Sequence, residues 1–301
     1  MPVPKIAALK SPQDKIAFIT GGAGGIGLAL GRVFLAAGMK VVLADLREEA
    51  LEGLRSQFDE GSVHLMKLDV TDGRAVERAA EETERLFGGV DVLCNNAGVN
   101  LFGPLSSAEP EDLRWVIDVN LHGVLNGLTA FVPRIKARGA GGHILNTASV
   151  AALVGSPRAP IYAASKAAVC ALSESLWYEL APHGIGVSIL CPGLVKSEIY
   201  RCWELHPSRP TAPSELKRLR EIHEKGMEPK EVAEKTLRAM LNNELYILTH
   251  PEHKDEFLQR SQQIAGSFPE EAVDPARAAF EQSRLKHQQV ALERGREGLK
   301  D

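Results

Sequence analysis

The amino-acid sequence predicts a single α/β domain in which a doubly wound parallel sheet carries helices on both faces, followed by a helical C-terminal extension. Three observations lead to this fold class. Short apolar, β-branched runs alternate with longer segments of helical period. A glycine-rich turn, TGGAGGIG, joins the first apolar run to the first helical segment. The chain has 301 residues, 44% hydrophobic and 25% charged, which suits a globular protein with one sizeable core.

Six apolar runs are expected to form the sheet, because continuous apolar character is typical of strands that are covered on both faces. They lie at residues 16–20, 41–44, 63–68, 90–94, 143–147 and 186–190. The helical segments between them lie at residues 25–37, 47–58, 72–87, 109–137 and 160–181. Right-handed crossovers bring the carboxyl ends of such strands to one edge, where ligands bind. The residues directly after each apolar run are therefore the candidates for a functional site.

The pattern changes after the sixth run. Residues 194–228 hold prolines, aromatic residues and mixed charges, with no clean strand. A helix at 229–242 and a short strand at 245–248 complete a domain that we place at residues 14–250. Residues 251–301 are rich in Gln, Glu and Arg. They are expected to be helical and to pack partly on the domain or on a partner subunit, with a disordered tail as the alternative.

Composition and charge exclude several classes of function. The formal net charge of −4 gives no reason to expect nucleic acid or a membrane surface as a partner. No apolar run approaches the ~18 residues of a membrane helix, and the N-terminus lacks the apolar stretch of a signal peptide, so we expect a cytoplasmic protein. The cysteines lack metal-ligand spacing and are interpreted as reduced, mostly packed thiols, with no metal site. They are Cys94, Cys170, Cys191 and Cys202.

The turn after the first strand is suited to holding a pyrophosphate. Glycines allow a tight turn and let backbone N–H groups approach the phosphates, and the following helix adds unpaired donors and the positive end of its dipole. A plain strand–helix turn is the alternative, but the strand before, the helix after and the acid at the next strand end indicate a dinucleotide site. Its candidate residues are Gly21, Gly24, Gly25, Ile26 and Gly27.

The end of the second strand favours NAD over NADP. Asp45 follows the apolar run directly, where a carboxylate can accept hydrogen bonds from a ribose diol and repel a 2′-phosphate. Leu46 is placed in the same cofactor site. Arg47 could reach a phosphate, although we interpret it as a solvated charge at the start of a helix.

Three motifs together resemble the short-chain dehydrogenases/reductases. The spacing Thr20-Gly21-x-x-x-Gly25-Ile26-Gly27 resembles the cofactor signature of that family, and NNAG at residues 95–98 matches the signature after its fourth strand. Ser149 precedes Tyr162 by thirteen residues, and Lys166 follows four residues later, which also matches the family. The resemblance covers residues 14–250 well and the tail poorly. It implies a Rossmann fold, a nicotinamide cofactor, and residues 194–228 as a lid that closes over the substrate.

The resemblance also implies which residues meet the cofactor. Asp69 and Val70, after the third strand, would lie near the adenine, although Asp69 could equally cap a helix. Asn96, Ala97 and Gly98 would lie beside the ribose and nicotinamide. The turn after the sixth strand would hold the nicotinamide, Val195 through its backbone and Ser197 in place of the usual threonine. Its residues are Pro192, Gly193, Val195 and Ser197.

Four residues would carry the chemistry by this resemblance. Tyr162 and Lys166, four apart on a helix, share one face. A tyrosine has a pKa of about 10, and a neighbouring ammonium lowers it by ~1–3 units, so Tyr162 would act as base in oxidation and acid in reduction. Ser149 would hydrogen-bond the substrate oxygen. Asn120 would kink its helix and hold a water linked to Lys166, whereas an exposed helix asparagine is the alternative.

The residues around the site favour an apolar or aromatic secondary alcohol or ketone. The lid holds seven Lys/Arg and six Asp/Glu, a near balance that argues against a highly charged substrate. Ser149 and Tyr162 would face a wall formed by Phe102, Leu153, Tyr200 and Trp203, unless these only pack the lid onto the domain. The stretches NNAGVNLFGPL and GHILNTASVAALVG resemble a bacterial, NAD-preferring branch that contains Cα-dehydrogenases of lignin-derived aryl-ether alcohols.

Two other functions compete with this one. An NADPH-dependent reductase of 3-oxoacyl compounds is possible in this family, but Asp45 argues against it. A non-catalytic dinucleotide-binding scaffold or sensor is the alternative from another class, and the intact Ser149, Tyr162 and Lys166 argue against it. By the same resemblance we expect a homo-oligomer, dimer or tetramer, assembled through the helices at 109–137 and 160–181.

Overall fold

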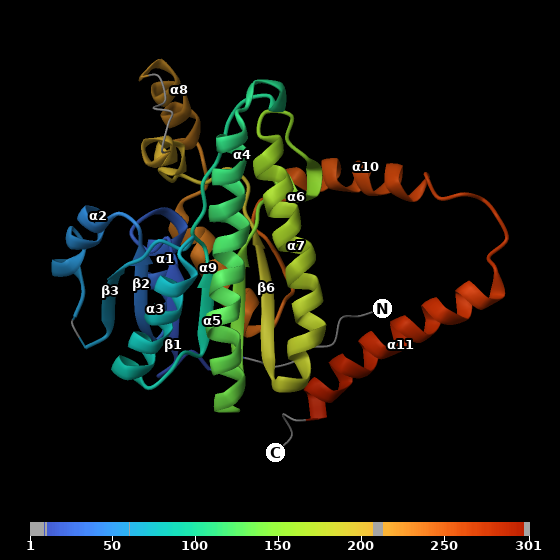
Figure 1. Ribbon diagram of the computed structural model, residues 1–301, viewed down its shortest axis with the longest axis horizontal. Coiled ribbons are helices and arrows are strands. Elements are labelled where there is room, and N and C mark those ends of the chain that lie inside the picture. Colours follow the sequence, from blue (N-terminus) through green and yellow to red (C-terminus); the bar gives the residue numbers. More distant parts are fainter. Residues whose placement is uncertain (1–8, 10, 60, 207–212, 298–301) are drawn as a thin grey trace.

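The computed structural model describes residues 9, 11–59, 61–206 and 213–297, and these form one doubly wound α/β unit (Figure 1). Its strands are all parallel and follow the order β3-β2-β1-β4-β5-β6-β7. They are β1 Ile16–Thr20, β2 Lys40–Asp45, β3 Val63–Lys67, β4 Val92–Asn95, β5 Gly142–Thr147, β6 Ile185–Cys191 and β7 Tyr246–Leu248. The strand order reverses between β1 and β4. The predicted fold class is confirmed.

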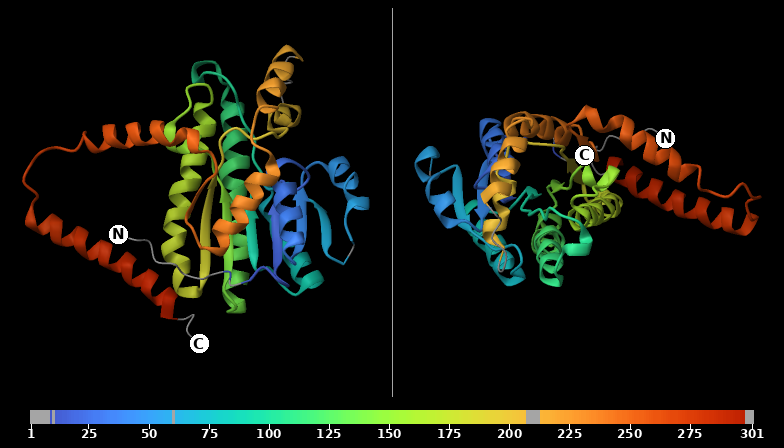
Figure 2. Two further views of the ribbon diagram at one scale, coloured as in Figure 1. Left: turned by 180° about the vertical axis from the view of Figure 1, so that it is seen from behind. Right: turned by 90° about the horizontal axis from the view of Figure 1, so that it is seen from above.

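Helices cover both faces of the sheet because alternate strand residues point to opposite sides. On β1, Phe18 joins the core beneath α3, α5 and α7, whereas Ile19 joins the core beneath α1 and α9. Figures 1 and 2 show the two layers. The helices are α1 Gly25–Ala36, α2 Glu48–Glu52, α3 Gly73–Phe87, α4 Pro110–Ile117, α5 Gly123–Arg138, α6 Ala151–Val154, α7 Pro160–Leu180, α8 Pro213–His223, α9 Pro229–Leu241, α10 Lys254–Ala265 and α11 Pro275–Glu297.

Three elements differ by more than one residue from their predicted bounds. The helix expected at 47–58 ends at Glu52, since Gly53 follows, and continues as a 3-10 turn, Arg55–Gln57. The helix expected at 109–137 is interrupted by a π-helical turn, Asp118–His122. The fourth strand starts at Val92 because the buried Asp91 uses its carboxylate to accept the N–H of Ile16 at 3.0 Å.

The last third of the chain forms the lid and an arm. The lid contains a 3-10 helix, Ile199–Leu205, and α8, and its residues 207–212 lie outside the described part of the chain. The tail is helical through α10 and α11, so the disordered alternative is wrong for these residues. Within the described residues, no helix has the length and apolar character required to cross a membrane. The division at residue 250 stays a prediction.

Buried polar groups in the sheet make stability depend on pH. His143 on β5 is fully buried, and its Nε2 lies 2.9 Å from the hydroxyl of Ser188, which donates to the carbonyl of Glu244 at 2.6 Å. Since Ser188 uses its hydrogen on Glu244, Nε2 of His143 is the protonated nitrogen of a neutral ring. Burial lowers the pKa of His143 to about 3.

The low pKa of His143 predicts acid destabilisation. Below about pH 6.5, the ordinary pKa of histidine, His143 is protonated in the unfolded chain but stays neutral in the folded chain. The contribution of His143 to the free energy of unfolding therefore falls by up to about 1.4 kcal/mol for each unit that the pH is lowered, down to about pH 3. In urea titrations between pH 7 and 5, His143→Gln should lose stability less steeply than wild type, whereas the exposed control His183→Gln should not. Equal slopes for wild type and His143→Gln would refute this assignment.

Candidate active site

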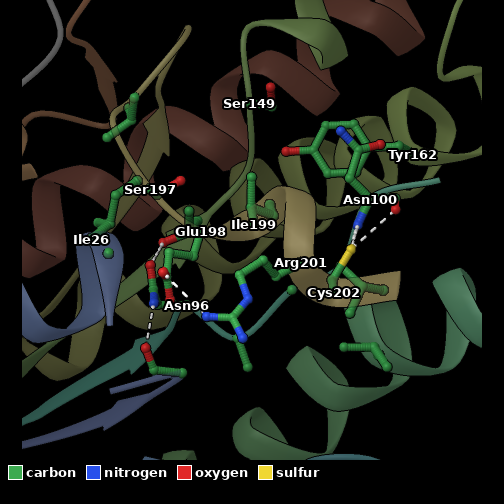
Figure 3. Close-up of a pocket in the computed structure, with 18 of the residues that line it drawn as sticks. Ile26, Asn96, Asn100, Ser149, Tyr162, Ser197, Glu198, Ile199, Arg201 and Cys202 are labelled. Carbon is green, nitrogen blue, oxygen red and sulfur yellow. Dashed lines mark hydrogen bonds and ion pairs between the residues drawn. The ribbon is translucent and has the colours of Figure 1, made fainter. Parts of the chain in front are cut away.

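The carboxyl edge of the sheet opens into a cavity of about 1090 Å³. The glycine turn and the ends of β2, β3 and β4 line one half, and the lid lines the other (Figure 3). The cavity includes the point where strand order reverses, the usual ligand site in such sheets. It is large enough for an extended ligand together with a second small molecule.

The glycine turn forms a cradle at the start of α1. Gly21 and Gly25 have positive φ of 66° and 51°, and both line the cavity with Gly24 and Ile26. Gly27 differs from the prediction, because it does not line the cavity. A Cβ at Gly27 would lie 2.1 Å from the carbonyl oxygen of Gly21, so this glycine lets α1 pack against the turn. Because a pyrophosphate needs backbone donors at a helix N-terminus, the cradle fits one.

Asp45 and Arg47 form a pair at the next strand end. The buried carboxylate of Asp45 accepts the N–H groups of Ala23 and Arg47, each at 3.0 Å. The Nε of Arg47 lies 3.3 Å from the same carboxylate, and its guanidinium reaches Gly24 of the glycine turn. Arg47 is the N-cap residue of α2 and its side chain is 37% exposed, as interpreted, but it also lines the cavity, as Leu46 does.

The third strand end contributes Asp69 and Val70 to the cavity wall. The carboxylate of Asp69 accepts from the N–H of Thr71 at 2.9 Å and from its hydroxyl at 2.7 Å. The cap of α3 is Asp72, whose carboxylate accepts from Arg74 and Ala75. Asp69 therefore shapes the loop and is not the helix cap.

The NNAG segment is tied to the glycine turn by side chains. The hydroxyl oxygen of Thr20 accepts the N–H groups of Asn96 at 2.9 Å and Ala97 at 3.0 Å. The side-chain amide of Asn96 donates back to the carbonyl of Thr20 at 3.1 Å. At Gly98, a Cβ would lie 3.2 Å from Oδ1 of Asn120 and 3.3 Å from Nζ of Lys166. Asn96, Ala97 and Gly98 thus form a close-packed floor to the cavity.

Asn120 lies in the π-helical turn and is fully buried, so the exposed alternative is wrong. Its Oδ1 accepts the N–H of Val99 at 2.8 Å, and its Nδ2 donates to the carbonyl of Val99 at 2.9 Å and to the hydroxyl of Ser165 at 3.1 Å. Ser165 in turn donates to the carbonyl of Tyr162 at 2.7 Å. Asn120 therefore joins the NNAG loop to the turn of α7 that carries Tyr162, through a serine that sequence reasoning missed.

The end of β5 and the start of α7 bring Ser149, Tyr162 and Lys166 together at the cavity. The hydroxyl of Ser149 accepts the N–H of Ala151 at 3.2 Å, and its interaction with the phenol of Tyr162 acts to lower the pKa of that phenol. The ammonium of Lys166 lies 5.8 Å from the centre of the Tyr162 ring and donates to the carbonyl of Thr147 at 2.7 Å. The predicted common face of the helix thus points both side chains toward the same end of the cavity.

Burial controls the acidity of this pair. It raises the pKa of Tyr162 to about 12, against the smaller, lowering effect of the hydrogen bond with Ser149. It lowers the pKa of Lys166 to about 8. The expectation that Lys166 would lower the pKa of Tyr162 is opposite to the structure, because loss of water around the phenol outweighs an ammonium that contacts Thr147.

Two histidines hold the turn after β6. The N–H of Gly193 donates to Nδ1 of His250 at 2.9 Å, and Nε2 of His250 lies 2.9 Å from the carbonyl of Leu194. Since Nδ1 is the acceptor, Nε2 carries the proton and donates. His223 of α8 bonds the carbonyl of Val195 at 3.1 Å through Nδ1.

The sequence reasoning missed both histidines, although His250 follows β7 almost directly and so obeys the rule for strand ends. The cavity-lining residues of this turn are Pro192, Gly193, Leu194, Val195 and Ser197. Ser197 faces the glycine turn, since its Cβ would lie 3.2 Å from one placed on Gly25.

The lid supplies an apolar wall that differs in part from the prediction. Phe102 and Trp203 line the cavity, and so do Trp115, Ile199, Cys202 and Leu205. Tyr200 and Leu153 are not among the described lining residues. The ring of Tyr200 lies against α8, where its centre is 5.4 Å from that of His223. Leu153 packs instead against the core that includes α7.

Polar contacts hold the lid against the domain. The thiol of Cys202 donates to the carbonyl of Asn100 at 3.2 Å and accepts its N–H at 3.3 Å (Figure 3). A buried ion pair joins His206 to Asp112 of α4 at 3.1 Å. All four cysteines are buried and free, as predicted.

One arginine on the lid side of the cavity is paired with carboxylates, and Arg158 and Arg218 also line it. Arg201 pairs with Glu204 at 3.0 Å and with Glu198 at 3.3 Å (Figure 3). The basic and acidic side chains of the lid thus balance in part through individual ion pairs such as these. The site combines a dinucleotide-sized cradle, a phenol hydroxyl and an apolar wall, a combination suited to proton transfer beside a bound cofactor.

Comparisons with known proteins agree with this arrangement. A C alpha-dehydrogenase of Sphingobium sp. (strain NBRC 103272 / SYK-6) is 38% identical over 276 residues, covering 89% of this chain and 90% of that protein. A short-chain dehydrogenase from Novosphingobium aromaticivorans has a TM-score of 0.82 at 39% identity, covering 96% of this chain and 100% of that one. One from Burkholderia phymatum, solved in complex with NAD, has a TM-score of 0.79 at 33% identity, covering 87% and 98%. The family model for short chain dehydrogenase matches residues 15–206, and the protein therefore belongs to the short-chain dehydrogenase/reductase family.

Proposed function

We propose that this oxidoreductase interconverts a secondary alcohol and a ketone with NAD(H), and that its substrate is apolar or aromatic. The observation that carries the proposal is that Ser149, Tyr162 and Lys166 line the cavity together, where its glycine-turn half meets its apolar half. The similarity to a C alpha-dehydrogenase supports an alcohol as the substrate class. We place the enzyme in the cytoplasm as a homo-oligomer, dimer or tetramer.

The residues present fit a nicotinamide dinucleotide, which when bound would supply hydride transfer. The glycine turn would hold its phosphates, Asp45 its adenosine ribose, and Val195 the carboxamide. Ser149 would orient the substrate oxygen by a hydrogen bond. Tyr162 would take the hydroxyl proton of an alcohol, or give its own proton to a ketone oxygen. Asn120 would connect Lys166 through water to solvent.

The pKa values set a preference between the two directions. With a pKa of about 12, Tyr162 is a neutral phenol at pH 7 and is ready to act as an acid in ketone reduction. Alcohol oxidation needs the phenolate, so it should gain as pH rises. Lys166 keeps its charge below about pH 8, where it favours the phenolate over the phenol.

The apolar wall supports an aromatic substrate. Trp203, Trp115 and Phe102 face the cavity, and Arg201 is neutralised by its two glutamates. Aromatic side chains bury large apolar areas and stack on rings. A compact aromatic secondary alcohol should therefore bind better than a charged one.

Removing the phenol hydroxyl tests the mechanism. Tyr162→Phe should lower kcat by about 10²–10⁴-fold with an NAD Kd within about twofold of wild type, since general acid–base catalysis contributes on that order. The measurement is NADH absorbance across a panel of aryl secondary alcohols. Tyr200→Phe is the matched control, because Tyr200 faces His223 and should keep wild-type turnover. A wild-type kcat in Tyr162→Phe would contradict the proposed role of Tyr162 as the general acid and base.

The Asp45–Arg47 pair tests cofactor choice. Wild type should have the higher kcat/KM with NAD. Asp45→Asn keeps an acceptor for the N–H of Ala23 but removes the charge that repels a 2′-phosphate and pairs with Arg47. The NADP-to-NAD ratio of kcat/KM should rise at least about tenfold, equal to about 1.4 kcal/mol. Adding Arg47→Gln to that variant should reverse the gain. A wild-type preference for NADPH would instead support the 3-oxoacyl-type reductase.

His250 should act as a positioning residue for the nicotinamide half of the site. His250→Ala releases Gly193 and Leu194 and should lower kcat by about 10–100-fold, since misplacement by ~1 Å has that effect. His250→Asn keeps an acceptor near Nδ1 and should recover part of kcat. The control is His253→Ala, which alters the same cavity wall. The positioning role would be wrong if His253→Ala lowered kcat as much as His250→Ala, or if kcat in His250→Asn were as low as in His250→Ala.

A further inference from the structure

The C-terminal arm, residues 254–297, touches its own domain at both ends and stands away from it in between. It comprises α10, a connection and α11. At its start α10 contacts α6, and near its end Leu292 is buried against the core beside α7. Figures 1 and 2 show the middle of the arm projecting from the body, with an opening between it and α7.

The arm carries large apolar side chains that the described chain leaves between 36% and 75% exposed. Phe268, Val273 and Phe280 are 74%, 75% and 69% exposed. The complete set is Phe257, Leu258, Ile264, Phe268, Val273, Phe280 and Leu285. Soluble monomers rarely gather exposed apolar surface of this kind, and where they do it marks a contact site.

The exposed apolar area suits a stable protein contact. An aromatic side chain has roughly 150–250 Å² to bury, so the seven side chains together expose on the order of 700 Å². A standard interface buries about 800 Å² on each partner. Polar atoms around these side chains bring the arm to that size.

Charge distinguishes between possible occupants. The arm holds seven Lys/Arg and eight Asp/Glu, whereas a helix that binds anionic membrane carries a strongly basic polar face. Nucleic acid would require a similar basic surface. A nearly neutral arm instead suits a protein surface of mixed charge, such as that of this chain.

The separation of the arm's two contacts with the domain also fits a protein like this one. The arm contacts the domain near both ends of α7, whose 21 residues span about 31 Å. The exposed segment between these contacts is therefore long enough to lie along a helix of a second copy. Two copies related by a twofold axis can each place a surface in the arm of the other, so that both arms are covered at once.

We propose that the C-terminal arm clasps a second copy of this chain, with Phe268 and Phe280 packed on that copy. The arm is then an assembly element, additional to the helices around which we expected the oligomer to form. Its root lies beside the active site: His253, just before α10, lines the cavity, and α6 begins two residues after Ser149.

The test compares assembly masses in full-length protein. Wild type should sediment at twice 32.6 kDa or more, and Phe268→Asp/Phe280→Asp should have at most half the wild-type mass with an unchanged circular dichroism spectrum. The matched control Gln263→Asp/Gln282→Asp adds the same charge at exposed polar positions of the arm and should keep the wild-type mass. An unchanged mass in the phenylalanine variant, or a monomeric wild type, would overturn the proposal.

Two further measurements apply to the wild-type protein and do not depend on the variant folding. Amide hydrogen exchange in residues 255–290 should slow as protein concentration rises through the assembly range, and concentration-independent exchange there would overturn the proposal. Vesicles containing phosphatidylserine should leave the sedimentation unchanged. Co-sedimentation with them would assign the arm to a membrane instead.

Discussion

The hydroxyl of Thr20 holds together the two halves of the sheet at the point where strand order reverses. It accepts the N–H groups of Asn96 and Ala97 and lies 3.4 Å from the carbonyl of Cys94, so one side chain satisfies the backbone where β1 and β4 diverge. Each buried N–H left without a partner would cost about 1–3 kcal/mol. Without this contact, the glycine turn and the NNAG floor could not keep the spacing that a dinucleotide requires.

A chain of hydrogen bonds connects this junction to Tyr162. The NNAG loop continues to Val99, which Asn120 holds through both its N–H and its carbonyl. Asn120 reaches Ser165, and Ser165 holds the carbonyl of Tyr162. The π-helical turn at Asn120 makes this possible, because it widens the helix where its side chain must turn inward. The π-helical turn thus fixes the start of α7 relative to the NNAG segment.

Much of this could be predicted from sequence because strand ends obey a simple geometry. Apolar runs predicted the strands to within about two residues, and Asp45 and Asp69, which directly follow two of the runs, line the cavity. Asn95, which follows a third run, is instead buried and donates to Oδ1 of Asn146. Orientation within irregular segments could not be obtained in this way. Tyr200 and Ile199 are neighbours in the lid, yet Ile199 lines the cavity whereas Tyr200 packs against His223, and nothing in the sequence distinguishes the two orientations.

The direction of the pKa shifts and the partners of the charged side chains could not be predicted from the sequence either. The spacing of Tyr162 and Lys166 suggested a lowered phenol pKa, but the sign depends on how much water each group loses, which no spacing contains. The sequence does not show that the guanidinium of Arg47 pairs with the carboxylate of Asp45. His250 lies 57 residues from the glycine that it holds, so a single sequence carries no local signal for their contact.

The segments beyond β6 complete the cavity that begins at the sheet edge. The glycine turn and Tyr162 come from the chain before β6 ends, whereas Trp203, His223 and His250 come from segments beyond it. These segments are held in two ways. Helix α9 packs with α1 in the core on one face of the sheet. The lid is held by polar contacts, such as Cys202 with Asn100, and by a small apolar cluster that Cys202 shares with Val99 and Val116. In the assembly proposed above, an arm that begins beside this wall would place the subunit contact and the proposed substrate contact on the same segment of chain.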